Sequence, residues 1–440
     1  MPACGQWVRG AIVGGALCVM ASHAWGQATP PRGPKEAPPT PTTAPSAVQP
    51  SLGPPVTAYP LELLGLLSPA GQRGPFTLTP SIAISEEYND NLFLDNRNRQ
   101  WELITGFSPV LTLSVNRPSY QLSGGYSFTA ELYERESRFS NAFERQNFIA
   151  SGSYQPTQQF TFTVADSFAL DRSTNRVATQ TFATGRQESW SNTFGPGMRW
   201  QMTPRTSLTL GASYGVLRFK GAAVGGAGAG TDSDTYGLQS TLGHVLTPRL
   251  TGTMGYGFTY LEVRGEENSR THTPTLGVSY LLTPTLTGSI TGGPSITEIG
   301  GETLMSPSGT ASLGQTLQFG SVSVQYTRAV AVAGGLGGTT DNQTASGALT
   351  LPNLWRDLIF VIGPSYSIAE SVSRRQTSQV DVRALTLSLS VTYQIARFAS
   401  VFAGYTLLQQ RTGGRSVEQV DVDQNRVRLG LQFGYPINFD

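Results

Sequence analysis

The feature that most constrains the fold is a strict alternation of two kinds of residue from Tyr120 to Leu132. Apolar side chains or glycine occupy the even positions, and mostly polar side chains occupy the odd ones. Successive side chains of a β-strand point to opposite faces, so a period of two indicates a strand with one apolar face. Strands of soluble proteins usually have about five or six residues. The length of this run therefore favours a strand that crosses a membrane.

The same alternation recurs after Gly74. It is found again in residues 160–164, 208–214, 385–393 and 427–435. Nothing beyond the N-terminus contains the 18 or so consecutive apolar residues that a membrane-spanning helix needs. The sequence therefore predicts an all-β fold.

Two kinds of connection take turns between the predicted strands. Tight turns are expected at residues 117–118, 155–156, 203–204, 247–248, 283–284, 320–321, 352–353 and 396–397. Longer polar or Gly-rich loops are expected at 89–99, 134–142, 172–186, 220–232, 264–269, 299–308, 334–341, 372–378 and 412–420. Eight turns and nine loops connect eighteen strands, and this even number brings both ends to the same side.

This alternation of short and long connections predicts a single antiparallel transmembrane β-barrel over residues 76–440. About eighteen strands are expected, with sixteen as the alternative, short turns in the periplasm and long loops outside the cell. The barrel must close, because lipid offers no partner to an unpaired strand edge. A soluble β-solenoid is the alternative fold, but its period would be shorter. The expected location is the outer membrane of a Gram-negative bacterium.

The acidic residues agree with this orientation. After Gly74 they fall in or beside the long loops, with Asp166, Asp357 and Asp440 as the exceptions. Arginine instead recurs at the short turns, for example at Arg117. Acidic side chains are therefore expected to concentrate on the cell surface.

The N-terminal region has the pattern of an exported chain. Residues 1–26 combine Arg9, an apolar run and small residues near Ala24, which predicts a signal peptide. Residues 27–75 are rich in proline and are expected to form a disordered periplasmic tether. The only cysteines, Cys4 and Cys18, lie within the predicted signal, so the mature chain has no thiol chemistry.

The composition makes nucleic-acid binding and catalysis poor hypotheses. Charged residues are only 13% of the chain and the net charge is +1, which gives no field to attract a polyanion. His244 and His272 are expected at opposite ends of the barrel, so they cannot share a catalytic site. We therefore expect no enzyme; a site that uses His272 with an acidic loop residue is the alternative. The stretch Gly221–Gly230 lacks the Lys-Ser/Thr of a phosphate loop, and no cofactor is expected.

A barrel of sixteen to eighteen strands can enclose an aqueous channel. Its predicted lining is rich in Thr, Ser, Gln and Gly, which suits polar solutes. Arg199, Arg426 and Arg428 are the candidates for pore-lining residues; a cluster of them would favour anions, and pairing with acidic neighbours is the alternative. A barrel plugged by its own loops, acting as a surface structural or adhesive protein, is the other hypothesis.

The tyrosines on the apolar faces are interpreted as interfacial belts. They are Tyr120, Tyr126, Tyr133, Tyr256, Tyr260, Tyr393 and Tyr435.

The first predicted loop supplies a weak candidate for a Ca²⁺ site. Glu86, Glu87, Asp90 and Asp95 offer the hard oxygen ligands that Ca²⁺ prefers, without the spacing of an EF-hand. Solvated loop charge, or bridging to lipopolysaccharide through divalent ions, is the alternative. Lipid and lipopolysaccharide of the outer membrane are the expected surroundings.

The last strand carries a more specific pattern. Arg428, Gly430, Phe433 and Tyr435 resemble the assembly signal of outer-membrane barrels, in which a polar residue, a glycine and two alternating aromatics have this spacing. The resemblance implies recognition by the barrel-assembly machinery. Here the residues 436–440 follow the second aromatic, so Phe439 is an alternative terminal aromatic.

Residues 80–94, which enter a strand after the Pro-rich leader, resemble the opening of the β-barrel porin 2 family of Gram-negative bacteria. Members of that family are often associated with surface-polysaccharide loci. The resemblance implies an outer-membrane channel for the passage of polar solutes or the export of polysaccharide. In that case the tether would contact a periplasmic export partner.

Overall fold

The computed structural model describes residues 75–173, 182–183, 185–224, 230–332, 334–373, 376, 379–413 and 421–439. The predicted signal peptide and almost all of the predicted tether lie outside the described residues. Among the described residues, no helix is long and apolar enough to cross a membrane.

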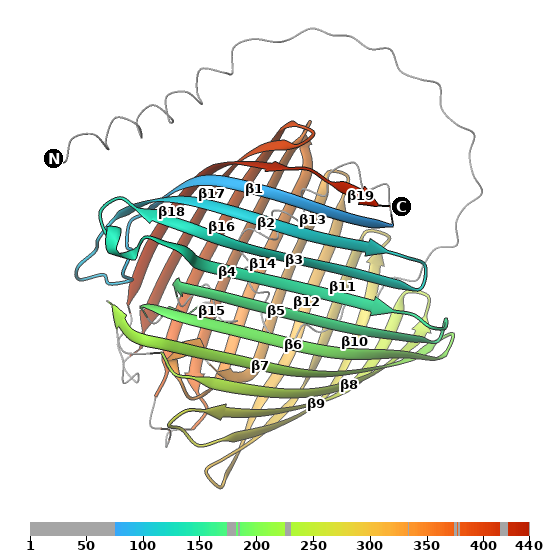
Figure 1. The fold of residues 1–440 in the computed structure, drawn as a ribbon. Helices are drawn as coiled ribbons and strands as arrows, with labels where there is room; N and C mark the ends of the chain where they lie inside the picture. Colours follow the sequence, from blue (N-terminus) through green and yellow to red (C-terminus); the bar gives the residue numbers. More distant parts are fainter. Residues whose placement is uncertain are drawn as a thin grey trace, which may run out of the picture. The chain divides into compact units, whose positions relative to one another are not determined.

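Eighteen long antiparallel strands dominate the described part of the chain (Figure 1). They are β1 (Phe76–Asn89), β2 (Glu102–Asn116), β3 (Tyr120–Tyr133), β4 (Asn141–Tyr154), β5 (Phe160–Ser173), β6 (Arg186–Thr203), β7 (Thr206–Val224), β8 (Ser233–Thr247), β9 (Leu250–Val263), β10 (Ser269–Thr283), β11 (Leu286–Ile299), β12 (Glu302–Leu317), β13 (Gly320–Val332), β14 (Thr339–Trp355), β15 (Leu358–Ser371), β16 (Asp381–Ala396), β17 (Ala399–Thr412) and β18 (Val422–Gly434). Two short 3-10 helices, η2 (Ser137–Phe139) and η3 (Gly334–Leu336), lie in loops.

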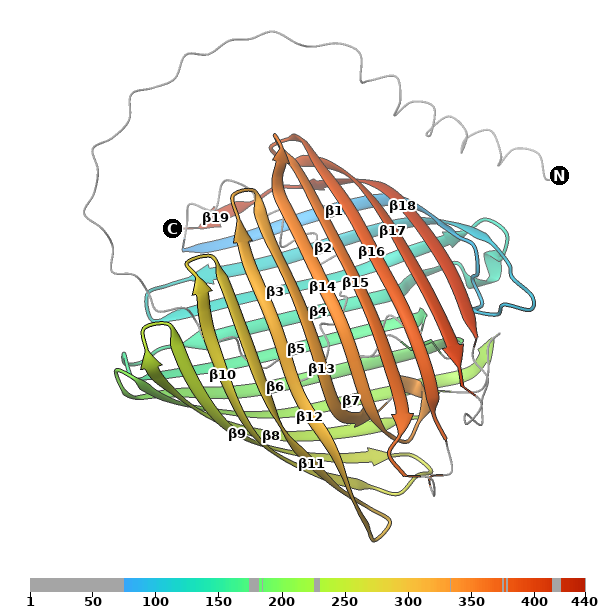
Figure 2. The same ribbon diagram turned by 180° about the vertical axis from the view of Figure 1, so that it is seen from behind.

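Each strand pairs with its neighbour in sequence, and β18 pairs with β1 from Ser81↔Gly434 to Asn89↔Arg426. The sheet therefore closes on itself, and the two views show strands on every side of the barrel (Figures 1 and 2). Closure leaves no long strand edge for lipid to cover, which a membrane-spanning sheet requires. The prediction of an antiparallel barrel of eighteen strands is confirmed.

A short strand, β19 (Ile437–Phe439), follows β18 and pairs with the first residues of β1. The Phe439 ring packs edge-on against Phe76, with 5.1 Å between the ring centroids. Both ends of the barrel thus lie at the rim that carries the tight turns. In outer-membrane barrels this rim faces the periplasm.

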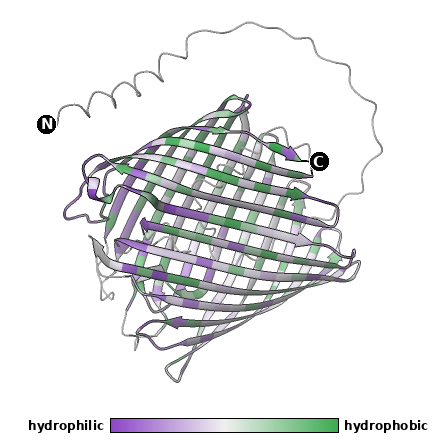
Figure 3. Cartoon of the chain, in the orientation of Figure 1, coloured by the Kyte–Doolittle hydropathy of each residue, from purple (hydrophilic) through white to green (hydrophobic). Residues whose placement is uncertain are grey.

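Alternate residues of each strand face lipid and lumen, as the sequence pattern predicts. The outer face carries the exposed large hydrophobic side chains, and hydropathy alternates along the strands (Figure 3). Aromatic pairs lie near both ends of the outer face: Phe160 stacks on Trp200 near the periplasmic rim, and Phe168 lies beside Trp190 toward the other end. These pairs have the positions of interfacial girdles.

Tyr133 is an exception to the predicted tyrosine belts. It is 3% exposed and its hydroxyl donates to the buried carboxylate of Glu131, so it faces the lumen. The physical reason is the alternation along β3: Leu132 faces lipid, so the next residue, Tyr133, lies on the polar, inward face. The assignment of Tyr133 to the lipid interface was wrong.

Three predicted connections also differ from the structure. The long loop expected at 299–308 is a two-residue turn at Gly300–Gly301, where both glycines have positive φ (56° and 76°). Two left-handed residues form the hairpin turn whose twist matches the strands. Pro352 and Asn353 lie within β14, at an irregularity between Leu351 and Trp355, where a missing N–H is tolerated. Gly320 and Ser321 open β13 instead of forming the turn.

Candidate functional site

The inner wall of the periplasmic half of the barrel is polar and open to solvent. On β3 and β4 the inward-facing Gln121, Ser123 and Ser151 are exposed, and the two serine hydroxyls lie 2.6 Å apart. Further round the barrel, hydroxyl pairs join adjacent strands in this half, for example Ser289–Ser312 at 2.7 Å. Short hydroxyl side chains leave the centre of the barrel free for water.

The inner wall of the extracellular half is buried instead. On β3 the inward-facing Ser127, Thr129 and Glu131 are 3%, 4% and 5% exposed. These residues follow the exposed Gln121 and Ser123 on the same face of the same strand. Something inside the barrel therefore covers the wall above about its middle.

The cover is formed by loops that turn inward. We define the loop plug as Leu92, Phe93, Leu94, Phe182, Ala183 and Leu336. They come from the connections β1–β2, β5–β6 and β13–β14. The plug packs on the wall in three apolar clusters.

Each cluster joins loop residues to inward-facing wall residues. Phe182 packs with Ala369, Val380, Val382 and Ala384. Leu94 and Ala183 pack with Leu408 and Val422, and Leu336 contacts both of these clusters. Leu92 and Phe93 pack with Ile104, Tyr133 and Phe139. Because Phe182, Leu92 and Leu94 are at most 2% exposed, burial of their apolar surface holds the loops inside the barrel.

Glutamine side chains fasten these loops to the wall. Gln410 on β17 accepts from the Ala183 N–H at 2.7 Å and donates to the Ala183 carbonyl at 2.8 Å. Gln376 lies in the β15–β16 connection and makes the same pair of bonds with the backbone of Thr339, the first residue of β14, so it fastens a further loop to the wall. Gln424 donates to the Asn91 carbonyl at 2.9 Å. A primary amide can bond a backbone N–H and C=O together, so Gln410 and Gln376 each satisfy both buried backbone groups of one residue.

A network of buried charges lies on the inner wall beside the plug. Arg145 lies between two carboxylates: its Nη2 donates to Glu131, and its Nε lies 2.9 Å from Asp171. Glu131 also accepts from the hydroxyl of Tyr133, which in turn accepts from Arg186 Nη2 at 2.7 Å. Breaking such a pair leaves a buried charge without compensation, so the network fixes β3 to β6 in the extracellular half.

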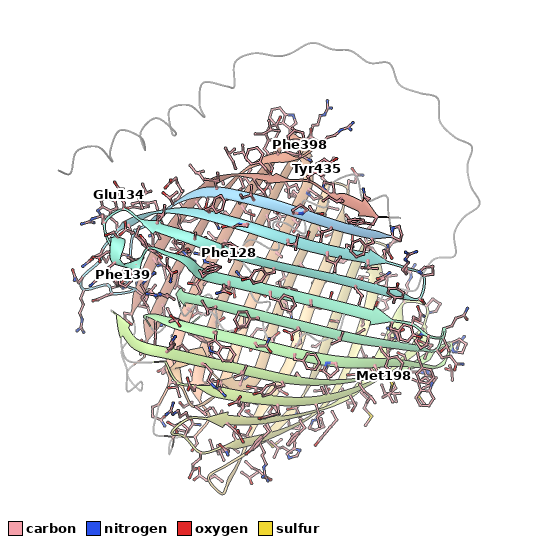
Figure 4. All side chains as sticks on the ribbon, in the orientation of Figure 1. Phe128, Glu134, Phe139, Met198, Phe398 and Tyr435 are labelled. Atoms are coloured by element: carbon pink, nitrogen blue, oxygen red, sulfur yellow. The ribbon has the colours of Figure 1, made fainter. Side chains whose placement is uncertain are left out.

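Glu102, which is fully buried, positions the next loop. Its Oε1 accepts from the N–H groups of Leu103 and Arg135, and its Oε2 accepts from the Glu136 N–H at 2.9 Å. The loop carries η2, and Glu134 and Phe139 lie at the long-loop end of the barrel (Figure 4). The Glu102 carboxylate is thus the hydrogen-bond acceptor for three backbone N–H groups.

The three predicted pore-lining arginines all have inward-facing positions. Arg428 lies opposite Glu87 in register, donates from Nε to Ser85 Oγ at 3.0 Å and lies over the Phe402 ring. Arg426 is two residues away on β18 and is 5% exposed. Arg199 lies far from them, between Thr161 and Thr209 near the periplasmic rim. The structure therefore brings Arg426 and Arg428 together, and their role in lining a pore stays a prediction.

The four residues of the Ca²⁺ hypothesis do not converge. Glu86 faces outward and accepts from Thr105 at 2.8 Å, whereas Glu87 faces the lumen. Asp90 accepts from Asn425, and Asp95 accepts from the Arg97 N–H. Adjacent strand residues point to opposite faces, so Glu86 and Glu87 cannot share an ion. Among the described residues, no group of three or more His, Cys, Asp or Glu could hold a metal ion.

The two histidines lie on the outer face at opposite ends. His244 bonds Thr206 at 3.0 Å on the periplasmic side, and His272 bonds the Tyr256 hydroxyl at 2.7 Å on the other side. Neither ring faces the lumen.

Arg428, Gly430 and Phe433 of the predicted assembly signal lie on the closing strand β18, and Tyr435 follows its last residue. Arg428 and Gly430 face inward, Phe433 faces outward, and the Tyr435 N–H donates to the Pro80 carbonyl of β1 at 3.1 Å. Residues 437–439 continue as β19, so Tyr435 does not end the β-structure. Recognition by the assembly machinery stays a prediction.

Sequence reasoning raised a barrel plugged by its own loops as the alternative hypothesis, but it did not identify the residues of the loop plug. Its signal is an apolar triplet, Leu92–Leu94, inside an otherwise polar loop, and a further aromatic at Phe182. Such residues in an extracellular loop need a surface to cover, and the lumen provides one.

A closed antiparallel barrel with an apolar outer band, a polar inner wall and inward-turned loops is an integral protein of the outer membrane, with the architecture of a porin. No family model and no curated protein matches the sequence.

Three solved structures are similar in fold. OpdO of Pseudomonas aeruginosa is 12% identical, with a TM-score of 0.42, and the match covers 82% of this chain and 97% of that one. The outer membrane protein OpdK of the same species is 8% identical, with a TM-score of 0.41, and 82% and 99% are covered. OccAB4 of Acinetobacter baumannii is 10% identical, with a TM-score of 0.41, and 83% and 100% are covered.

Proposed function

We propose that the protein is a porin-like channel for small polar solutes. The observation that carries the proposal is the inner wall of the periplasmic half, where Gln121, Ser123, Ser151 and their neighbours are solvent-exposed inside a closed barrel of eighteen strands. Barrels of this size leave room for an aqueous channel. A lining of hydroxyl and amide groups replaces the hydrogen bonds that a polar solute gives up to water.

The loop plug sets the resistance of this channel. It lies in the extracellular half, where Leu94, Phe182 and Leu336 meet the wall. Apolar constrictions oppose the passage of ions because they exclude water. We therefore expect a small conductance with the plug in place and a larger one when the loops move away from the wall.

The charges near the plug favour a solute that carries both hydrogen-bonding groups and charge. Arg426, Arg428 and Arg186 lie on the inner wall beside Glu87, Glu131 and Asp171. Both signs are present, but most of these side chains are buried while the plug is in place. A solute therefore meets them only when the loops move away from the wall.

Single-channel recording in planar bilayers tests the proposal. The refolded chain should give discrete conductance steps, with brief openings if the plug moves. A folded, heat-modifiable barrel that never conducts would contradict the channel and favour a plugged surface protein. Measuring ion selectivity under a salt gradient in the same bilayers then shows which charges the path exposes.

Export of polysaccharide is a narrower form of the proposal. It rests on the resemblance of residues 80–94 to the β-barrel porin 2 family, and it requires the plug to leave the lumen completely. Uptake of labelled oligosaccharides into vesicles that contain the barrel would distinguish it: exclusion of chains longer than a disaccharide would limit the channel to small solutes.

A further inference from the structure

One acidic residue lies on the lipid-facing wall at mid-strand. Asp166 is near the centre of β5, and its register partners Ala150 and Phe194 are outward-facing residues of β4 and β6. The aromatic pair Phe160–Trp200 lies toward the periplasm from it, and the pair Phe168–Trp190 lies toward the cell surface. Asp166 is therefore within the apolar band between the two girdles.

This position is costly for a carboxylate. Other outward-facing acidic residues of the described strands lie near the extracellular strand ends, as Glu86, Asp234 and Asp341 do, where headgroups and water reach them. Within the hydrocarbon there is no water to solvate the group, and an ionisable residue at this depth normally serves a function.

Asn192 on β6 is the partner of this carboxylate. Its Nδ2 donates to Asp166 Oδ1 at 2.8 Å. Neither side chain makes another hydrogen bond to a described residue. A carboxylate can accept about four hydrogen bonds and a primary amide can donate two. Asp166 Oδ2 and the second N–H of Asn192 therefore have hydrogen-bonding capacity left at the outer surface.

The residues beside this pair on the outer face have small side chains. The row that contains Asp166 continues through Ala150 on β4 to Gly124 on β3, both outward-facing. Phe194 borders the pair on the other side. Small residues let another protein backbone approach closely in a membrane, and polar side chains there bond across the contact.

We propose that Gly124, Ala150, Asp166 and Asn192 form a contact surface with a second copy of this chain in the membrane. The pair is self-complementary: about a two-fold axis, Asn192 of each copy can donate its second N–H to Asp166 of the partner subunit. Two reciprocal bonds would then satisfy both carboxylates. Lipid chains have no donor to offer, so lipid alone leaves them unsatisfied.

Cysteine cross-linking of the mature chain in vesicles tests this surface, because the sequence after residue 26 contains no cysteine. Ala150→Cys should give a disulfide-linked dimer on mild oxidation. Ala403→Cys is the matched control, since Ala403 also faces outward but lies on β17. Equal cross-linking of the two variants would overturn the proposal.

The size of the assembly provides an independent measurement. In detergent micelles, sedimentation should give a dimer for the native chain, and Asp166→Leu or Asn192→Leu should weaken it by at least about tenfold, given about 0.6–1.7 kcal/mol for each lost bond. Heat-modifiability shows whether each variant is folded. A native chain that is monomeric in both micelles and vesicles, or that carries bound lipopolysaccharide at this surface instead, would contradict the second copy.

Discussion

Neighbouring side chains of one strand make different contacts at the wall of this barrel. Gln410 and Gln409 are neighbours on β17, yet Gln410 is fully buried and clamps the backbone of Ala183, whereas Gln409 is exposed on the outer face. Adjacent residues of a strand face opposite sides. Gln410 therefore holds a loop inside the barrel, whereas Gln409 contacts the lipid side.

Gln410→Ala is expected to increase the open-channel fraction. It removes two hydrogen bonds between the wall and the loop, each worth about 1 kcal/mol, so the population of the released loop should rise by about tenfold or more. Single-channel recording gives the open fraction directly. Gln409→Ala is the control and should behave like the native chain. Equal conductance of all three proteins would mean that this clamp does not limit the channel.

Arg145→Met is expected to destabilise the barrel. It leaves Glu131 and Asp171 buried without the guanidinium between them, which costs about 3–5 kcal/mol for a buried pair. The free energy of unfolding in a urea titration in vesicles reports the loss. Arg199→Met removes an inward-facing arginine that has no ion pair among the described residues, and it should change stability little. A similar stability of both variants would show that the network contributes little.

At the scale of the strands, the sequence was sufficient for most of the fold. Each strand has one face toward lipid, so apolar and polar residues alternate with a period of two. This period is present in the sequence from Tyr120 to Leu132. The sequence pattern gave wrong connections where the backbone conformation, and not the polarity of the side chains, determines how two strands are joined. Gly300–Gly301 forms a two-residue turn within the range 299–308 that was expected to be a long loop, and Pro352 lies inside a strand at an irregularity of the pairing.

The two faces of one strand should respond in opposite ways to the same substitution. Val164→Arg places a charge among lipid chains near the middle of β5 and should cost about 2–4 kcal/mol. Thr163→Arg introduces the same side chain on the solvent-exposed inner face and should leave the stability nearly unchanged. The yield of heat-modifiable protein after refolding, together with urea titrations, compares them. A larger loss for Thr163→Arg would contradict the orientation of β5.

At the scale of the whole molecule, the inner and outer surfaces follow different rules. The sequence pattern identifies the inward positions, including Arg199, Arg426 and Arg428, because parity is local. It does not show that Leu94, Ala183 and Leu408 meet, because these residues are far apart in the chain and meet only once the barrel has closed. The plug is held by tertiary contacts, and a local sequence pattern does not show which wall residues a loop contacts.

The uneven distribution of charge along the lumen leads to a prediction about selectivity. In the periplasmic half Arg199 lies between hydroxyl residues, whereas the other inward-facing arginines lie beside carboxylates toward the cell surface. Among the described inward-facing residues, Arg199 is therefore the charge that a solute from the periplasm would meet first. Its guanidinium should raise the local concentration of anions.

Arg199→Glu is expected to shift the channel toward cations. A change of two charge units at about 10 Å in water amounts to about 0.8 kcal/mol, and screening at about 0.1 M salt leaves about 0.3 kcal/mol. Anions and cations respond with opposite sign, so their permeability ratio should change by about threefold. The reversal potential under a salt gradient measures this ratio. Arg264→Glu makes the same charge change in the extracellular loop between β9 and β10 and is the control. If only the control shifted the reversal potential, the ions would be sorted at the extracellular loops, and the periplasmic half of the lumen would be a passive vestibule.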